Sequence, residues 1–205
     1  MSKKIILIAG PTASGKSKLA ISLAKKIKGE IINADSMQVY KEFSILSSRP
    51  AKSDLKKVKH HLYGFLSSTK HFSTGAWLKL VKKQIKLCIK KKKVPILVGG
   101  TGLYFDAITK GITKIPNINF KLRNQIRNLQ KKLGQEAFYK KLLKLDPKVK
   151  GKIETFDVQR SLRAYEVKKF TKKSIYDWFK ATKSEFKDYE IFKVFLDIPR
   201  EKLLK

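Results

Sequence analysis

The chain has 205 residues, of which 42% are hydrophobic, enough to bury the core of one elaborated α/β domain or of two small domains. A single cysteine excludes an internal disulfide framework, and no apolar run approaches the roughly 20 residues of a membrane-spanning helix. The net charge of +32 favours a polyanionic partner such as nucleic acid, although six arginines against 42 lysines indicate that part of it is genomic lysine bias. The first apolar run is too short for a signal peptide, so we expect a cytoplasmic protein without membrane contacts.

The first motif is a glycine-rich turn, GPTASGKS, at residues 10–17. A β-branched run at residues 3–9 precedes it and apolar residues at helical spacing follow it, which favours a phosphate-binding loop over an ordinary glycine turn. In such a loop the backbone N–H groups cradle phosphates, the lysine adds positive charge and the last serine offers its hydroxyl to Mg²⁺. The predicted diphosphate-binding residues are Gly10, Pro11, Thr12, Ala13, Ser14, Gly15, Lys16 and Ser17, with Ser17 as the metal-binding residue.

A second apolar run, at residues 30–34, predicts a buried strand that ends at Asp35. Ligands of open parallel sheets bind at the carboxyl ends of the strands, so Asp35 is placed for chemistry beside the phosphate loop. The same spacing allows a plainer role, in which Asp35 caps the turn after the strand.

Two adjacent histidines, His60 and His61, open a short strand predicted over residues 60–65. We expect no metal site there, because neighbours on a strand point to opposite faces and no carboxylate or cysteine follows at ligand spacing. A long helix then begins near Ser73, which can cap it, and carries Cys88 on its apolar side, where core packing is expected.

A third buried strand, at residues 94–98, leads into the turn GGTG at residues 99–102. Glycines at a strand's carboxyl end allow close approach to the backbone. Thr101 either caps the next helix or turns its hydroxyl into the crevice that contains Asp35 and Lys16.

Helical patterns then follow one another until a last strand at residues 190–196. We therefore predict a P-loop NTPase-like parallel α/β sheet with helices on both faces and an inserted helical domain. The predicted divisions are a core at residues 1–115, a helical insertion at 116–188 and a return to the core at 189–205.

The helical insertion contains several of the few arginines in this lysine-rich chain. Arg160 and Arg163 are three residues apart and share one helix face, together with Gln159. These side chains grip an RNA backbone or base edge, or they form a solvated face with Glu154 or Glu166 as ion-pair partners.

Taken together, the chain resembles the tRNA dimethylallyltransferases, also called isopentenyl-diphosphate:tRNA transferases. The matching stretches are GPTASGKS (10–17), DSMQVYK (35–41), HHL (60–62), FS (72–73), GGTGLYF (99–105), DP (146–147) and DVQRSLRAYEV (157–167). Many families share the phosphate loop, whereas its combination with DSMQVY and GGTGLY is much more specific.

The resemblance implies transfer of a dimethylallyl group from dimethylallyl diphosphate to N6 of the adenosine on the 3′ side of a tRNA anticodon, with Mg²⁺ assisting. It implies that Asp35 is the general base and that Thr101, also catalytic, helps to hold the diphosphate. The implied partners are the tRNA anticodon arm and the prenyl donor, and the implied state is a monomer. The implied tRNA contacts are Asp35, Ser36, Met37, Gln38, Thr101, Arg123, Gln159, Arg160, Ser161, Leu162 and Arg163.

The chain departs from the family pattern in three places. Thr155-Phe156 replaces a usual His-Pro pair, and FSILSSRP (43–50) replaces an Asp-Ile-Gly-Thr-Ala-Lys-Pro pattern. The family also continues beyond the position of Lys205, so the resemblance implies that its C-terminal third is missing. The alternatives are a P-loop small-molecule kinase with the helical stretch as lid, and a truncated tRNA-binding homologue with impaired catalysis.

Overall fold

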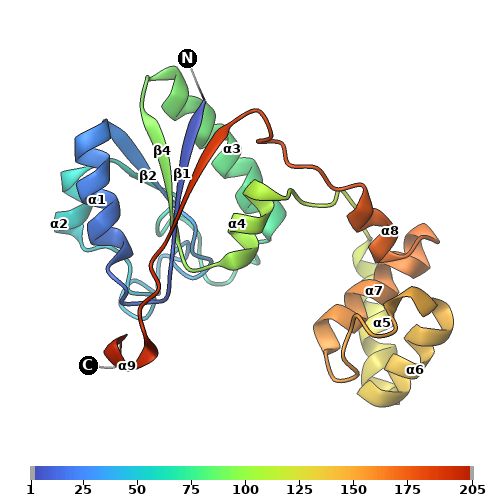
Figure 1. The fold of residues 1–205 in the computed structure, drawn as a ribbon. Coiled ribbons are helices and arrows are strands. Elements are labelled where there is room, and N and C mark those ends of the chain that lie inside the picture. The colour runs from blue at the N-terminus through green and yellow to red at the C-terminus, as the bar shows by residue number, and fades with distance from the viewer. Residues whose placement is uncertain (1–2, 204–205) are drawn as a thin grey trace. The chain divides into compact units, whose positions relative to one another are not determined.

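The structure, a computed structural model, describes residues 3–203, apart from the side chains at 200 and 202, and consists of two compact units. The chain up to Gly111 and from Ser184 onward forms the core unit, and Ile112–Lys183 forms the helical unit (Figure 1). The divisions expected at residues 115 and 188 thus lie a few residues earlier. The second boundary lies before Ser184 because the Ser184 hydroxyl donates a hydrogen bond to the Ile108 carbonyl at 2.5 Å, which ties Ser184 to the core unit.

Five parallel strands form the sheet of the core unit, as predicted, in the order β3-β2-β4-β1-β5. The central strand β4 lies between β2 and β1, so the carboxyl ends of all three are neighbours. This arrangement brings together the turns that follow them. The strands are β1 (Lys4–Ala9), β2 (Gly29–Asn33), β3 (His60–His61), β4 (Val94–Gly99) and β5 (Glu190–Phe195).

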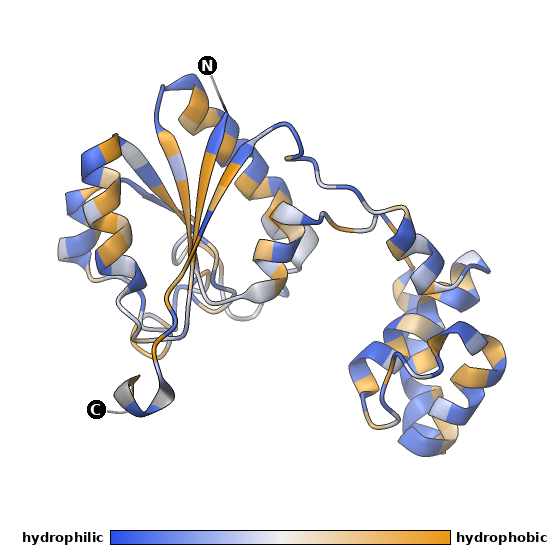
Figure 2. Cartoon of the chain, viewed as in Figure 1, coloured by the Kyte–Doolittle hydropathy of each residue, from blue (hydrophilic) through white to orange (hydrophobic). Residues whose placement is uncertain are grey.

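Helices cover both faces of the sheet, and their apolar stripes face the strands (Figures 1 and 2). On one face, α1 packs Ala20 and Ala24 against the strands. On the other, Trp77 of α3 is buried and stacks on Tyr104 of α4, with ring centroids 4.0 Å apart. Among the described residues, no helix is both long and apolar enough to cross a bilayer. The helices of the core unit are α1 (Lys16–Ile27), α2 (Lys52–Lys57), α3 (Thr74–Lys90), α4 (Gly102–Thr109) and α9 (Arg200–Leu203).

The strand predicted over residues 60–65 is much shorter than expected. It ends at His61 because Leu62 and Gly64 adopt left-handed conformations, with φ of 63° and 53°. Glycine suits the second of these positions, because its backbone is left-handed and a Cβ there would displace the Arg49 guanidinium, whose Nη1 would lie 1.9 Å away. The turn brings Tyr63 toward the carboxyl end of the sheet, where the candidate site lies.

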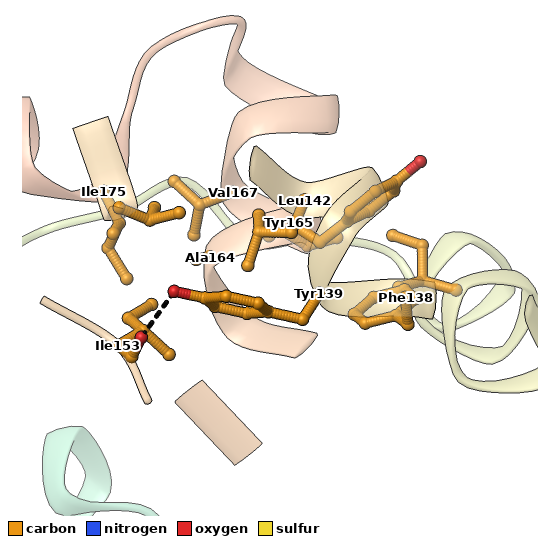
Figure 3. Packing of buried hydrophobic residues seen from close by; sticks show 11 residues of the cluster. Phe138, Tyr139, Leu142, Ile153, Ala164, Tyr165, Val167 and Ile175 are labelled. Atoms are coloured by element: carbon orange, nitrogen blue, oxygen red, sulfur yellow. Dashed lines mark hydrogen bonds between the residues drawn. The ribbon is translucent and has the colours of Figure 1, made fainter. Parts of the chain in front are cut away.

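The helical unit has its own core, in which Phe138, Leu142, Ala164 and Val167 are fully buried (Figure 3). Side chains cap three of its helices, α5, α7 and α8. Asn119 accepts a hydrogen bond from the Leu122 N–H at 2.8 Å. The elements of this unit are α5 (Phe120–Leu133), α6 (Gln135–Leu145), η1 (Pro147–Val149), α7 (Val158–Thr171) and α8 (Ile175–Lys180).

A buried hydroxyl ties this core together and permits a stability test. The Tyr139 hydroxyl donates to the Ile153 carbonyl at 2.7 Å (Figure 3). We expect Tyr139→Phe to lower the free energy of unfolding by about 1–3 kcal/mol, because the buried carbonyl loses its partner. The control is Tyr176→Phe, since the Tyr176 hydroxyl makes an exposed 3.2 Å bond to the Lys152 carbonyl. Urea unfolding measures both, and equal losses would contradict the assigned burial effect.

Candidate functional site

A hollow of about 140 Å³ opens at the carboxyl ends of β1, β2 and β4. Residues 12–17 of the phosphate loop line one side of it, and Asp35, Gln38, Tyr63 and Gly99 line the rest. It therefore lies where the strand order places the ligand of an open parallel sheet. The predicted loop, the strand-end carboxylate and the glycine turn meet at this point.

The phosphate loop is shaped to receive an anion. Ala13 and Gly15 adopt left-handed conformations, with φ of 65° and 82°, which curl the backbone ahead of α1. The Ser14 hydroxyl oxygen is buried and has no hydrogen-bond partner within the described part of the chain. Lys16 donates to the Pro11 carbonyl, and burial lowers the pKa of its ammonium while the charge of Asp35 raises it in part. An unpaired hydroxyl beside a partly buried cation fits a diphosphate group.

The first glycine of the loop is required by its surroundings. A Cβ on Gly10 would lie 2.9 Å from the carbonyl oxygen of Leu196, in the segment that follows β5. Any side chain would therefore push the loop away from the end of the sheet.

Asp35 is held by a clamp that the sequence analysis missed. Asn33, fully buried at the end of β2, accepts a hydrogen bond from the Asp35 N–H and donates to the Asp35 carbonyl, both at 2.9 Å. The same amide donates to the Leu62 carbonyl at 3.0 Å, which also anchors the turn after β3. Only the position of Asn33 next to the strand end could have signalled this role.

Asp35 both caps the turn after β2 and lines the hollow. Its Oδ1 accepts hydrogen bonds from the N–H groups of Met37 and Gln38, at 2.9 and 3.4 Å, which is the turn-capping role. Its Oδ2 lies beside Gly100, where a Cβ would be 3.5 Å away. One carboxylate oxygen therefore fixes the turn while the carboxylate as a whole lines the hollow.

The GGTG turn after β4 packs directly on the Asp35 turn. A Cβ on Gly99 would lie 2.1 Å from the carbonyl carbon and oxygen of Ala34, so only glycine fits. Thr101 occupies the cap position of α4 but makes no side-chain capping bond. Its Oγ1 instead accepts from the Ser36 N–H at 2.9 Å and donates to the Ser36 hydroxyl at 3.2 Å. Thr101 thus joins the two turns.

Two tyrosines near the hollow also escaped the sequence analysis. Burial, with a contribution from the Asp35 charge, raises the pKa of Tyr63. Burial, then the neighbouring Tyr40 and Asp35, raises the pKa of Tyr104 to about 12. Both hydroxyls are therefore neutral hydrogen-bonding groups at physiological pH.

A second, larger hollow of about 340 Å³ adjoins the first and shares Thr12 and Asp35 with it. Met37, Phe43 and Leu46 give it an apolar lining. Gln38 holds the loop that carries this lining, because its Nε2 donates to the Ser47 carbonyl at 2.8 Å. Asp35 therefore stands between an anion cradle and an apolar wall.

In the helical unit, two of the predicted arginines converge on one buried carboxylate. Arg123 Nε lies 3.7 Å from Glu166 Oε2, and Arg163 Nη1 lies 3.5 Å from the same oxygen. The Glu166 side chain is only 7% exposed, whereas those of Arg123 and Arg163 are 37% and 38% exposed. Glu166 thus holds one partly exposed cation on α5 and another on α7, and its pair with Arg163 matches the ion-pair alternative, whereas Arg160 pairs with Asp157 instead.

The remaining predicted RNA contacts of α7 differ in accessibility. Arg160 is largely exposed and pairs with Asp157 at 3.4 Å, and Gln159 is exposed. Ser161 is fully buried and accepts a hydrogen bond from Gln135. Leu162 packs against the core of the helical unit. The Ser161 side chain is therefore not accessible to RNA in this structure, whereas Leu162 remains partly exposed.

Comparison with known proteins identifies related chains. The family model described as IPP transferase matches residues 38–205. A tRNA dimethylallyltransferase of Pelagibacter ubique is 59% identical over 98% of this chain, and one of Rickettsia massiliae is 46% identical over 98%. The chain spans 64% and 56% of the lengths of these two relatives.

Two solved structures resemble the fold. A eukaryotic dimethylallyltransferase acting on tRNA superposes with a TM-score of 0.81 at 28% identity, covering 95% of this chain and 48% of that one. The tRNA isopentenylpyrophosphate transferase of Bacillus halodurans gives a TM-score of 0.60 at 30% identity, covering 98% of this chain and 62% of that one.

Proposed function

Because the chain belongs to the IPP transferase family, we propose that it transfers the dimethylallyl group of dimethylallyl diphosphate to N6 of an adenosine in tRNA. One observation carries the proposal: Asp35 lines both the phosphate-loop hollow and the apolar hollow beside it. A prenyl diphosphate has the same two parts, an anionic diphosphate and an apolar chain. A carboxylate where the two parts join would lie beside the reacting carbon.

The residues of the site suit the chemistry of this transfer. The bond between the allylic carbon and the diphosphate oxygen breaks, and the same carbon bonds to N6 of the adenine. The loop N–H groups and Lys16 stabilise the charge that develops on the leaving diphosphate. The adenine amino group is a weak nucleophile, so Asp35 accepts its proton as the new bond forms.

The hollow also suits a magnesium ion. The Ser17 hydroxyl and the Asp35 carboxylate both line it, and oxygen ligands are those that Mg²⁺ prefers. We propose that Ser17 holds the ion against the diphosphate, where it would neutralise part of the leaving group's charge.

For the tRNA we propose the anticodon arm as the bound part, and a cytoplasmic monomer as the acting form. Arg123 and Arg163, oriented by Glu166, and the exposed Arg160 and Gln159 supply donors in the helical unit. We propose that three residues near Asp35 contact the reacting nucleotide: Ser36, Met37 and Thr101. This nucleotide must leave its base stack to reach the site.

A transfer assay tests the proposal. The purified chain is incubated with Mg²⁺, labelled dimethylallyl diphosphate and a tRNA that carries adenosine on the 3′ side of its anticodon. We expect label in the tRNA, located on N6 of that adenosine by nucleoside analysis. ATP consumption with a small hydroxylated acceptor, without label in the tRNA, would instead establish the kinase alternative. Salt-sensitive tRNA binding without transfer would identify a binding homologue and overturn the proposed activity.

The RNA contact of the helical unit has its own test. We expect Arg160→Ala to weaken tRNA binding and to lower the slope of log Kd against log salt concentration by about 1, because one phosphate contact is lost. Arg127→Ala is the control, since Arg127 is also an exposed arginine of this unit but lies on α5. Binding titrations over a series of salt concentrations measure both slopes. Equal changes would show that only the general positive charge matters.

A further inference from the structure

A second group of reactive side chains lies between the sheet and α3, away from the proposed transfer site. Glu30 stands near the amino end of β2, His61 on β3, and Cys88 near the end of α3. The phosphate loop, by contrast, lies at the carboxyl ends of the strands. The proposed transfer reaction gives these three residues no role.

The three side chains converge at short range. Glu30 Oε2 lies 2.6 Å from His61 Nε2 and 3.7 Å from Cys88 Sγ. One ligand atom from each of the three lies within 4.8 Å of the others. The side chains of Glu30 and His61 are 8% and 13% exposed, and Cys88 is fully buried. At these separations, small side-chain movements would allow all three atoms to bind one ion.

Sequence spacing concealed this group. Glu30 precedes His61 by 31 residues and Cys88 by 58, so no ligand motif is visible along the chain. The two neighbouring histidines contact different residues, and only His61 joins the group. His60 instead contacts the Val58 carbonyl through Nδ1, at 2.8 Å.

His61 Nε2 is the atom that the polar side chains of this group share. Its Nε2 lies 2.6 Å from the Glu30 carboxylate and 3.2 Å from the Gln84 side-chain nitrogen. If Nε2 carries a hydrogen it bonds Glu30 and cannot accept from Gln84. If it carries none, its lone pair faces the carboxylate oxygen. A cation between the imidazole and the carboxylate would receive a lone pair from each of them.

We infer that Glu30, His61 and Cys88 form a binding site for a structural zinc ion. Thiolate, imidazole and carboxylate are the ligand types that Zn²⁺ takes in proteins, and thiolate selects against Mg²⁺ and Ca²⁺. Two anionic ligands and one neutral ligand would balance the charge of the ion, which suits a buried position. The side-chain oxygen of Gln84, with its amide turned over, or a water molecule completes a tetrahedron.

The ion would add a bond among three elements: β2 and β3, which already pair in the sheet, and α3, which packs on them. Strand β3 has two residues and lies at the edge of the sheet. It leads directly into Leu62 and Tyr63, whose turn is anchored by Asn33 beside Asp35. A zinc ion on His61 would therefore stabilise the start of a turn that shapes the transfer site.

Cobalt substitution tests the site directly. The untagged chain is titrated with Co²⁺, and its near-ultraviolet and visible spectrum is recorded, followed by displacement with Zn²⁺. We expect intense visible bands of tetrahedral cobalt and a thiolate-to-cobalt charge-transfer band at one ion per chain, both abolished by Zn²⁺. Because Cys88 is the single cysteine of the chain, a thiolate band can come only from this site. Cobalt bound without that band, or no stoichiometric binding, would overturn the inference.

Matched variants identify the ligands. We expect His61→Gln and Cys88→Ser each to raise the Kd for Zn²⁺ by more than about 100-fold, since loss of an outer partner alone costs about 10–100-fold. His60→Gln should leave the Kd unchanged, because His60 lies outside the group. Circular dichroism verifies the folding of each variant. If a variant does not fold, the cobalt spectrum of the unchanged chain still tests whether the site binds a metal ion. Equal affinities of the His60 and His61 variants would contradict the proposal.

Discussion

Replacement of Asp35 by asparagine is expected to lower kcat for prenyl transfer by about 10²–10⁴-fold, the usual contribution of a positioned general base. The change is selective because the Asn side-chain oxygen can still accept the hydrogen bonds that Oδ1 receives from Met37 and Gln38. The turn should therefore keep its shape while the site loses its proton acceptor. Single-turnover transfer to tRNA measures the rate, and separate binding titrations should show little change for donor and tRNA.

The control for this variant is Asp106→Asn. Asp106 is a half-exposed carboxylate on α4 that pairs with Lys110 at 2.8 Å, so the substitution removes a negative charge from the core unit without touching the hollow. We expect its transfer rate to match that of the unchanged chain. A rate for Asp35→Asn within a few-fold of the control would exclude Asp35 as the base.

Replacement of Lys16 by methionine is expected to lower kcat/KM for the prenyl donor by about 10²–10³-fold, comparable to the loss of one donor from an oxyanion site. Methionine keeps most of the chain length and loses the charge that would face the leaving diphosphate. The affinity for inorganic diphosphate, measured by calorimetry, should fall as well. Lys18→Met is the matched control, because Lys18 is an exposed lysine on the same helix. Equal losses in the two variants would show a general charge effect.

The pH dependence of diphosphate binding gives Lys16 a second signature. Burial lowers its pKa from the ordinary 10.5, in part against the opposing effect of Asp35. Only the protonated amine attracts the anion, so affinity should fall as the pH rises through this lowered pKa. The alkaline limb should be absent in Lys16→Met and retained in Lys18→Met.

The bounds of the strands and helices show which parts of the fold local sequence is sufficient to predict. Residues 10–17 could be placed on a strand-to-helix turn because phosphate-loop spacing and flanking periodicity are local properties. The parallel sheet and the helical unit followed from the same periodicity. The strand at residues 60–65 was predicted too long, because Leu62 leaves the strand to meet the Asn33 side chain, and that contact spans 29 residues.

The candidate site likewise contains some features that local sequence predicts and others that it does not. Local sequence was enough to predict the phosphate loop and the strand-end position of Asp35, since each depends on residues next to one another in the chain, whereas Gly99 is required because of its contact with Ala34. The folded structure shows that Asn33 clamps Asp35, that Thr101 bonds Ser36 and that Glu166 holds two arginines. It also shows that His61 meets Glu30 and Cys88. These contacts join strands and helices distant in sequence, and their geometry is set by sheet order and packing, which no local pattern records.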